Sequence, residues 1–138
     1  MIHDLRVNSH GYPSFFEGPE EENIRKWDRI LGRMEFLFRE ANEDTCRKKN
    51  PYEEEHDLAR EEFTTKYGMF GEKLKTEEEI AREKREHTHR LYMMSDVPEY
   101  VEISEKWMVA EGELREYRDR CLKQGMELMT KYFWNLWD

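Results

Sequence analysis

Two long stretches of the chain carry apolar residues at alternating steps of three and four, the spacing that aligns side chains on one face of an α-helix. The first stripe consists of Ile24, Trp27, Leu31, Met34, Phe38 and Ala41. The second consists of Ile103, Trp107, Ala110, Leu114, Tyr117 and Cys121. Such stripes predict long helices that bury their apolar faces against neighbouring helices. The expected fold class is therefore all-α, either a helical bundle or a long antiparallel helical hairpin.

Local signals divide the chain into four expected helices. Three glutamates follow Pro19, which suits a first turn because negative charge is favoured at the positive end of the helix dipole. Thr76 and Glu79 have the spacing of a capping box at the start of another helix. If the last helix bends, Gly112 and Gly125 are the places that favour it, since glycine in a helix interior costs about 1 kcal/mol relative to alanine; whether the helix continues past them is left open. The expected helices are about 19–48, 51–67, 76–92 and 98–137.

Residues 1–18 mix turn-forming residues with aromatic rings. Tyr12, Phe15 and Phe16 stand among glycines and a proline, a combination that predicts an irregular arm docking on the helices through its rings. The chain shows no internal repeat and no low-complexity linker. Residues 1–138 are accordingly expected to form a single helical domain with this N-terminal docking arm.

The charge and composition narrow the classes of function. Charged residues make up 40% of the chain and the net charge is −9. This balance argues against a general nucleic-acid binder, whose affinity depends on Lys and Arg that neutralise phosphates. It suits a protein that is kept in solution by its charge, or one with a basic partner. Two cysteines are too few for a disulfide scaffold, and no apolar run is long enough to span a membrane. We therefore expect a cytoplasmic protein without a membrane partner.

One cluster of basic side chains could hold a phosphate or a carboxylate. Arg82, Arg85 and His89 share a face of the expected helix 76–92, and Arg90 lies beside them. The glutamates around them are ordinary pairing partners on a helix surface, so a solvent-exposed, salt-bridged face is the alternative interpretation.

Three acidic side chains on the last helix have the spacing of a metal ladder. Glu113, Glu116 and Asp119 follow one another at steps of three, as in all-helical nucleotide pyrophosphatases that bind magnesium. The second acidic pair that such an enzyme requires is ambiguous, with Glu40 and Glu43 or Glu54 and Asp57 as candidates. Interleaved arginines also fit a solvent-exposed face. Magnesium is expected only if the enzyme interpretation holds, and no other cofactor is expected.

The C-terminal segment places aromatic residues around the whole circumference of a helix. They are Tyr132, Phe133, Trp134 and Trp137. One helix face cannot bury all of them, so either the N-terminal arm or another molecule is expected to cover them. Met93 and Met94 form a second apolar cluster, which suits either an adaptable partner surface or core filling at a helix end.

Four blocks near the two ends of the chain resemble a group of small proteins encoded by tailed bacteriophages and prophages of Gram-positive hosts. The blocks are His3-Asp4-Leu5, Gly11-Tyr12-Pro13-Ser14, the helix of Trp27, Ile30, Leu31 and Met34 with Phe36 and Phe38, and Lys131-Tyr132-Phe133 with Leu136-Trp137-Asp138. Residues 45–95 diverge from the group. The resemblance implies no activity; it implies expression in the cytoplasm of an infected or lysogenic bacterium, with an accessory or host-interaction role.

The leading hypothesis is a non-enzymatic phage accessory protein that binds a host or phage macromolecule, with inhibition of a bacterial defence system as one form of that role. The second hypothesis is a nucleotide-handling protein, either a magnesium-dependent pyrophosphatase or a protein that sequesters a signalling nucleotide. The third is a structural oligomer in phage assembly. A host or phage protein is the expected partner, and homo-oligomerisation is left open.

Overall fold

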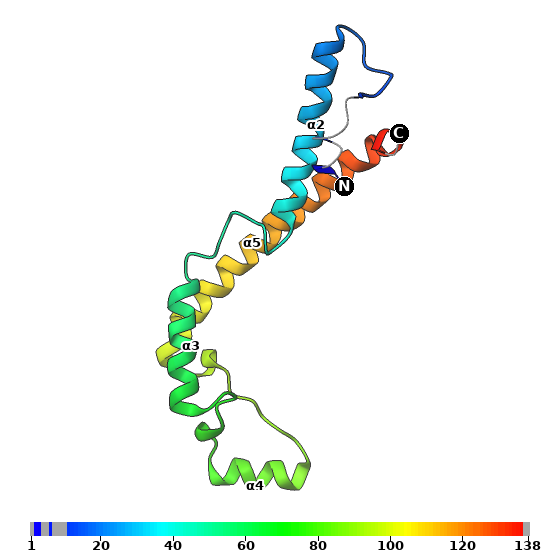
Figure 1. Cartoon of the computed structure of the whole chain (residues 1–138). Helices are drawn as coiled ribbons and strands as arrows, with labels where there is room; N and C mark the ends of the chain where they lie inside the picture. The colour runs from blue at the N-terminus through cyan, green and yellow to red at the C-terminus, as the bar shows by residue number, and fades with distance from the viewer. Residues whose placement is uncertain (1, 4–5, 7–10, 137–138) are drawn as a thin grey trace. The chain divides into compact units, whose positions relative to one another are not determined.

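The structure, a computed structural model, describes residues 2–3, 6 and 11–136, and within these it is all-α. The prediction of an all-α fold is confirmed, since these residues contain helices and no strand. Figure 1 shows the α-helices: α2 (Glu20–Ala41), α3 (Glu53–Tyr67), α4 (Glu77–Glu86) and α5 (Pro98–Lys131). Short 3-10 helices follow α3, precede α5 and end the described chain: η1 (Glu72–Leu74), η2 (Met94–Asp96) and η3 (Phe133–Leu136). Nowhere in this described part is a helix both long enough and apolar enough to cross a membrane.

The chain divides into two compact units. The first unit comprises Met1–Lys48 and Leu114–Asp138, and the second comprises Lys49–Glu113. Helix α5 is continuous through the boundary and contributes its first part to the second unit and its remainder to the first unit.

In the first unit, α2 packs antiparallel to the C-terminal part of α5 (Figure 1). Trp27, near the start of α2, meets Tyr132 just beyond the end of α5, with ring centroids 5.5 Å apart. Near the other end of α2, the ring of Phe38 lies against Gly125. This packing buries the middle of the predicted stripe of α2, where Leu31 and Met34 are 1% and 0% exposed, whereas Ile24 at its start is 39% exposed.

Rings of the N-terminal arm cover part of this core. Phe15 stacks on Tyr132 with centroids 6.1 Å apart, and Phe16 meets both Tyr132 and Trp27 edge-on. Such stacked and edge-on contacts are the favoured arrangements of aromatic rings. The arm thus covers Tyr132, one of the four C-terminal aromatic residues for which the sequence left the covering group open.

In the second unit, α3 packs antiparallel to the first part of α5. The ring of Phe63 meets Tyr100 edge-on at 6.1 Å, and His56 stacks on Trp107. Asn50 joins the start of this unit to α5, because its side-chain amide donates to the backbone carbonyl of Trp107 at 3.1 Å. These contacts place the N-terminal half of α3 beside the middle of α5.

Three helices end earlier than the sequence predicted. Helix α2 ends at Ala41 and not near residue 48, because the Glu40 carboxylate accepts the backbone N–H of Arg47 at 2.7 Å and its Nε at 3.0 Å. The Thr45 hydroxyl also donates to the Arg39 carbonyl, so residues 42–47 fold back on the helix end. The basic run at 47–49 therefore lies beyond the last turn of the helix.

Helix α4 begins as predicted but ends at Glu86 and not at residue 92. Thr76 Oγ1 accepts the backbone N–H of Glu79, which confirms the predicted N-cap. His87 then adopts a left-handed conformation with φ of 53°, a common way for a helix to stop. The Glu83 carboxylate accepts the backbone N–H of Arg90 and holds the chain in its new direction. At the C-terminus, α5 ends at Lys131 and a 3-10 helix replaces the predicted last turns.

Candidate binding cleft

An open apolar cavity of about 580 Å³ lies in the second unit. Its walls come from α3, from the segment that precedes α5, and from α5 itself. Four methionines contribute to its lining, namely Met69, Met93, Met94 and Met108, and we call the cavity the methionine cleft. Met69, Met93 and Met108 are 71%, 59% and 64% exposed, respectively. Exposed methionines around a cavity are unusual, because long apolar side chains normally gain stability by burial.

The cleft depends on a tight approach of residues 92–95 to the end of α3. The backbone N–H of Tyr92 donates to the Phe70 carbonyl at 3.0 Å, and the Tyr92 hydroxyl donates to the Glu79 carboxylate at 2.7 Å. Gly71 permits this approach, because a β-carbon there would lie 2.5 Å from the β-carbon of Tyr92. Its φ of 67° is also a conformation that glycine adopts with least cost.

A stacked pair of rings forms part of the lining. His56 and Trp107 lie face to face with centroids 4.1 Å apart and an interplanar angle of 11°. Trp107 Nε1 donates to Glu53 Oε2 at 2.8 Å, so the indole is held at its edge as well as on its face. The stacking and this hydrogen bond together hold the two rings in position.

Two buried polar atoms in the lining of the cleft have no hydrogen-bond partner among the described residues. They are His56 Nδ1 and Ser104 Oγ. The two residues are 6% and 5% exposed. A buried polar group without a partner costs about 1–3 kcal/mol, so native structures rarely leave one without a reason.

Arg60 is the charged side chain in the lining of the cleft, and the carboxylates of Asp57, Glu53 and Glu111 lie near His56. Burial lowers the pKa of His56, and the nearby Arg60 lowers it further, while Asp57, Glu53 and Glu111 act in the opposite direction. The imidazole is therefore neutral at neutral pH, with one ring nitrogen able to accept a hydrogen bond. The second unit as a whole carries 18 acidic and 10 basic residues, so it holds nearly all the net negative charge of the chain.

The four residues of the predicted basic cluster do not line the cleft, although Arg90 contacts Tyr92, which does. Arg82 and Arg85 lie exposed on α4, whereas His89 and Arg90 lie beyond the end of that helix. The guanidinium of Arg90 rests over the ring of Tyr92, 4.6 Å from its centroid. Because α4 ends at Glu86, His89 does not share a helix face with Arg82 and Arg85, contrary to the prediction.

The acidic ladder lies on α5 with all three side chains exposed at Glu113, Glu116 and Asp119. Of the candidate second pairs, Glu40 is buried and already engaged by Arg47. Within residues 2–3, 6 and 11–136, no three His, Cys, Asp or Glu side chains are grouped closely enough to hold a metal ion. Within the described residues, the three carboxylates of the ladder therefore do not meet other ligands at a common point.

The C-terminal aromatic residues separate into a buried and an exposed part. Tyr132 is 6% exposed and belongs to the core of the first unit, while Phe133 and Trp134 are 41% and 79% exposed. Phe133 and Trp134 meet edge-on at 5.2 Å. Trp137, the fourth residue of the predicted interaction surface, lies outside the described residues.

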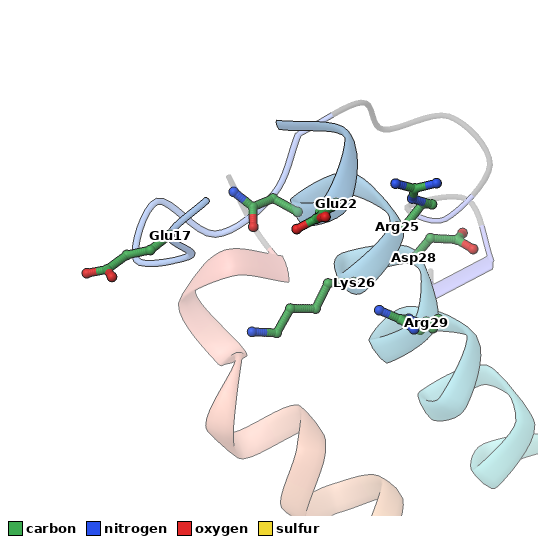
Figure 2. A pocket seen from close by; sticks show the side chains of 7 residues that line it. Glu17, Glu22, Arg25, Lys26, Asp28 and Arg29 are labelled. Atoms are coloured by element: carbon green, nitrogen blue, oxygen red, sulfur yellow. The ribbon is translucent and has the colours of Figure 1, made fainter. Parts of the chain in front are cut away.

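A hollow at the start of α2 is lined by charged side chains, whereas the methionine cleft is largely apolar. It is lined by Asn23 and by acidic and basic side chains in equal number: Glu17, Glu22, Asp28, Arg25, Lys26 and Arg29. Figure 2 shows that Glu17 extends away from the other labelled side chains. Asp28 is already paired with Arg6 at 3.1 Å, and Lys26 lies over the ring of Phe16. Mixed charges that are neutralised locally do not define a ligand.

Sequence reasoning identified part of the cleft but not its polar lining. It singled out Met93 and Met94, and the structure separates them, with Met93 exposed in the cleft and Met94 buried beside it. Ser104 and His56 were not predicted. Ser104 precedes Trp107 by three residues and so shares its helix face, a signal that was available. His56 is brought to that face only by the packing of α3.

Comparisons of the chain with protein families, with curated proteins and with solved structures give no match.

Proposed function

We propose that this chain is a phage accessory protein that binds another protein through the methionine cleft. The observation that carries the proposal is the cleft itself, an apolar cavity whose methionines are left exposed beside a pair of fixed aromatic rings. Methionine is flexible and polarisable, so a methionine-lined surface adapts to the apolar side chains of a partner. The bacteriophage setting rests on the resemblance of the chain ends, and a component of a bacterial defence system is the partner class that this setting suggests.

The experiment is affinity purification of the tagged chain from Gram-positive host cells, followed by mass spectrometry of the proteins that co-purify. Three variants are compared with the parent chain. The first carries Met93→Asp and Met108→Asp, which place charge in the cleft. The second carries Leu58→Asp, which introduces the same charge at a residue of α3 that is 67% exposed and does not line the cleft. The third carries Trp134→Asp and tests the exposed C-terminal aromatic residues.

The expected result is a stoichiometric protein partner that is lost from the Met93→Asp and Met108→Asp variant and retained by Leu58→Asp. A partner that every variant retains, or that only Trp134→Asp loses, contradicts binding through the cleft. All substituted side chains are exposed, and exposed substitutions usually change stability by about 0.5 kcal/mol or less. A change in binding therefore does not reflect unfolding, which a thermal melt of each variant checks.

The nucleotide-handling hypothesis stays a prediction that the same preparation addresses. Small molecules released by heating the purified chain are identified by mass spectrometry. A nucleotide released at stoichiometric amount, and lost on Arg82→Ala with Arg85→Ala, would favour that hypothesis over the protein-binding one. The structural-oligomer hypothesis predicts a concentration-dependent mass in light scattering.

A further inference from the structure

A small hollow on the first unit is lined by three arginines, and we call it the arginine hollow. It has a volume of about 250 Å³ and is formed by α2, by the segment that follows α2 and by a residue of the N-terminal arm. Its charged lining consists of Arg6, Arg39, Arg47, Glu35 and Glu40. Three cations therefore meet two carboxylates here, whereas the charges that line the hollow at the start of α2 are equal in number.

The carboxylates of the arginine hollow are buried, whereas its guanidiniums are exposed. The side chains of Glu35 and Glu40 are 14% and 3% exposed. The side chains of Arg6, Arg39 and Arg47, which form ion pairs with them, are 42%, 64% and 75% exposed. Because the negative charge is withdrawn from the solvent and the positive charge faces it, the surface that this hollow offers to a ligand is cationic.

The two carboxylates are ionised at neutral pH and leave most donors of the arginines available. Burial alone would raise the pKa of Glu35, but His3 and the arginines that contact it hold this pKa below its ordinary value. The backbone N–H of Arg47 lowers the pKa of Glu40. A guanidinium has five N–H donors. Within the described residues, at most two donors of each guanidinium in the hollow bond to a carboxylate.

Gly32 lets the guanidinium of Arg6 lie against α2. A β-carbon at this position would lie 3.2 Å from Arg6 Cζ and 3.4 Å from its Nε and Nη1, closer than most such contacts. Gly32 stands in the interior of α2, where glycine is less favourable than alanine. Position 32 thus gives up helix stability and leaves room for a cation at the hollow.

Charges next to the hollow leave its positive excess in place. Asp28 accepts Arg6 Nε at 3.1 Å and offsets one charge. Arg33 adds another cation, since its guanidinium lies over the ring of the lining residue Phe36, 5.4 Å from the centroid. The first unit as a whole carries 14 acidic and 13 basic residues, so its overall charge scarcely opposes the approach of an anion.

We propose that the arginine hollow binds the phosphate group of a small molecule. Guanidiniums pair with phosphate oxygens through charge-assisted hydrogen bonds, which are stronger than neutral ones. Three exposed guanidiniums around one hollow match the several oxygens of a phosphate group better than the two of a carboxylate. The volume lies below the roughly 300–1,000 Å³ of sites that enclose a drug-sized ligand, so the rest of a phosphate ester would remain outside the hollow. This site does not depend on the binding of a protein by the methionine cleft.

The test is isothermal titration calorimetry with the full chain. The ligands are inorganic phosphate, adenosine monophosphate, and adenosine, which lacks the phosphate group. The parent chain is compared with Arg39→Met, which removes a guanidinium from the hollow, and with Gly32→Ala, which displaces the guanidinium of Arg6. Arg29→Met is the matched control, because it removes the same charge from an exposed residue of α2 that does not line this hollow. A thermal melt of each variant checks that it is folded.

The expected result is that both phosphate ligands bind the parent chain and that adenosine does not. Arg39→Met is expected to weaken both by about tenfold, as the loss of one charge-assisted hydrogen bond does. Gly32→Ala is expected to weaken both as well. Arg29→Met should change either Kd less than about twofold at physiological salt, where screening acts over about 8 Å. Tighter binding of adenosine monophosphate than of inorganic phosphate would identify the ligand as a phosphate ester, and equal Kd values would identify it as phosphate itself.

Three results overturn the proposal. The first is the absence of binding of both phosphate ligands at about 10 mM, a concentration at which a site with a Kd of about 1 mM is mostly occupied. The second is binding of adenosine as tight as that of adenosine monophosphate. The third is a loss of phosphate binding in Arg29→Met as large as the loss in Arg39→Met, because the effect would then reflect overall charge and not the hollow.

Discussion

The imidazole of His56 lies flat on the indole of Trp107, with ring centroids 4.1 Å apart and planes inclined by 11°. One ring comes from α3 and the other from α5, so the stack joins the two helices that border the methionine cleft. The indole is further held by Glu53, which accepts its N–H, and by Asn50, which donates to the Trp107 carbonyl. The pair therefore links the packing of the second unit to the chemistry of its candidate site.

His56 is expected to make stability depend on pH. Its pKa is lowered in the folded chain, chiefly by burial, so the unfolded chain takes up a proton at higher pH than the folded chain does. The free energy of unfolding is then highest above the ordinary histidine pKa of about 6.5 and declines as the pH falls from there toward the lowered pKa. Urea unfolding at a series of pH values measures this decline.

The control for this prediction is His56→Phe, which keeps an aromatic ring against Trp107 but cannot bind a proton. Its stability is expected to change less between pH 7 and pH 5 than that of the parent chain. An identical pH dependence in both chains would show that the imidazole does not cause it.

Gly71→Ala is expected to destabilise the second unit by about 1–3 kcal/mol, the usual cost of forcing a strained backbone conformation. The added β-carbon would lie 2.5 Å from that of Tyr92, and the φ of 67° disfavours any side chain. Thermal unfolding followed by circular dichroism measures the effect. Gly11→Ala is the control, because no atom lies within 4 Å of a β-carbon there, and it should leave the melting temperature nearly unchanged.

The two glycines of α5 are expected to respond oppositely to alanine. Gly112 lies in the helix interior with open space around it, so Gly112→Ala should stabilise the chain by about 0.5–1 kcal/mol. A β-carbon at Gly125 would lie 3.1 Å from the ring of Phe38, so Gly125→Ala should lose that gain or become destabilising. Chemical denaturation of the two variants compares them directly, and an equal gain at both positions would contradict the close packing of α2 against α5.

Leu31→Ala is expected to cost about 2–5 kcal/mol, because it opens a cavity in the core of the first unit. Leu31 is 1% exposed and packs among Trp27, Met34 and Tyr132. Ile24→Ala serves as the comparison, since Ile24 belongs to the same predicted stripe but is 39% exposed. A similar loss of stability in both variants would mean that the stripe is not buried as the structure shows.

Arg47→Met is expected to destabilise the chain at neutral pH and to have less effect in acid. The pKa of Glu40 is lowered first by the backbone N–H of Arg47, which the variant keeps, and further by the Arg47 guanidinium, which the variant removes. A carboxylate whose pKa is lowered on folding stabilises the folded chain at pH values above its ordinary pKa. This contribution is lost as the pH falls through the pKa that the carboxylate has in the folded chain. Melting temperatures at neutral and acidic pH, compared between the two chains, test this, and an equal difference at both pH values would contradict it.

Much of the helical architecture follows from local features that a sequence displays. The stripe from Trp27 to Phe38 has to be buried because its alternation of three and four places every apolar residue on one side. Thr76 begins a helix because its hydroxyl can accept the N–H of Glu79, which lies three positions along the chain. Such effects act within one or two turns, so they can be predicted without knowing the rest of the fold.

Helices α2 and α4 end earlier than predicted because a glutamate near the end of each helix accepts a backbone N–H from farther along the chain. Glu40 is buried and accepts the N–H of Arg47, which ends the regular helix. Glu83 captures the N–H of Arg90 in the same way. These bonds compete with helical ones by small differences in free energy, and the sequence pattern does not reveal which will prevail.

The candidate site was decided by tertiary packing. Met93 was recognisable as part of an apolar cluster, but its exposure depends on how residues 92–95 meet α3. His56 and Ser104 are 48 positions apart in the chain, and their shared cavity exists only because α3 lies along α5. A periodic pattern states which face of a helix is apolar, because that is a property of one helix. Which faces meet, and which polar atoms are then left without a partner, is a property of two helices together.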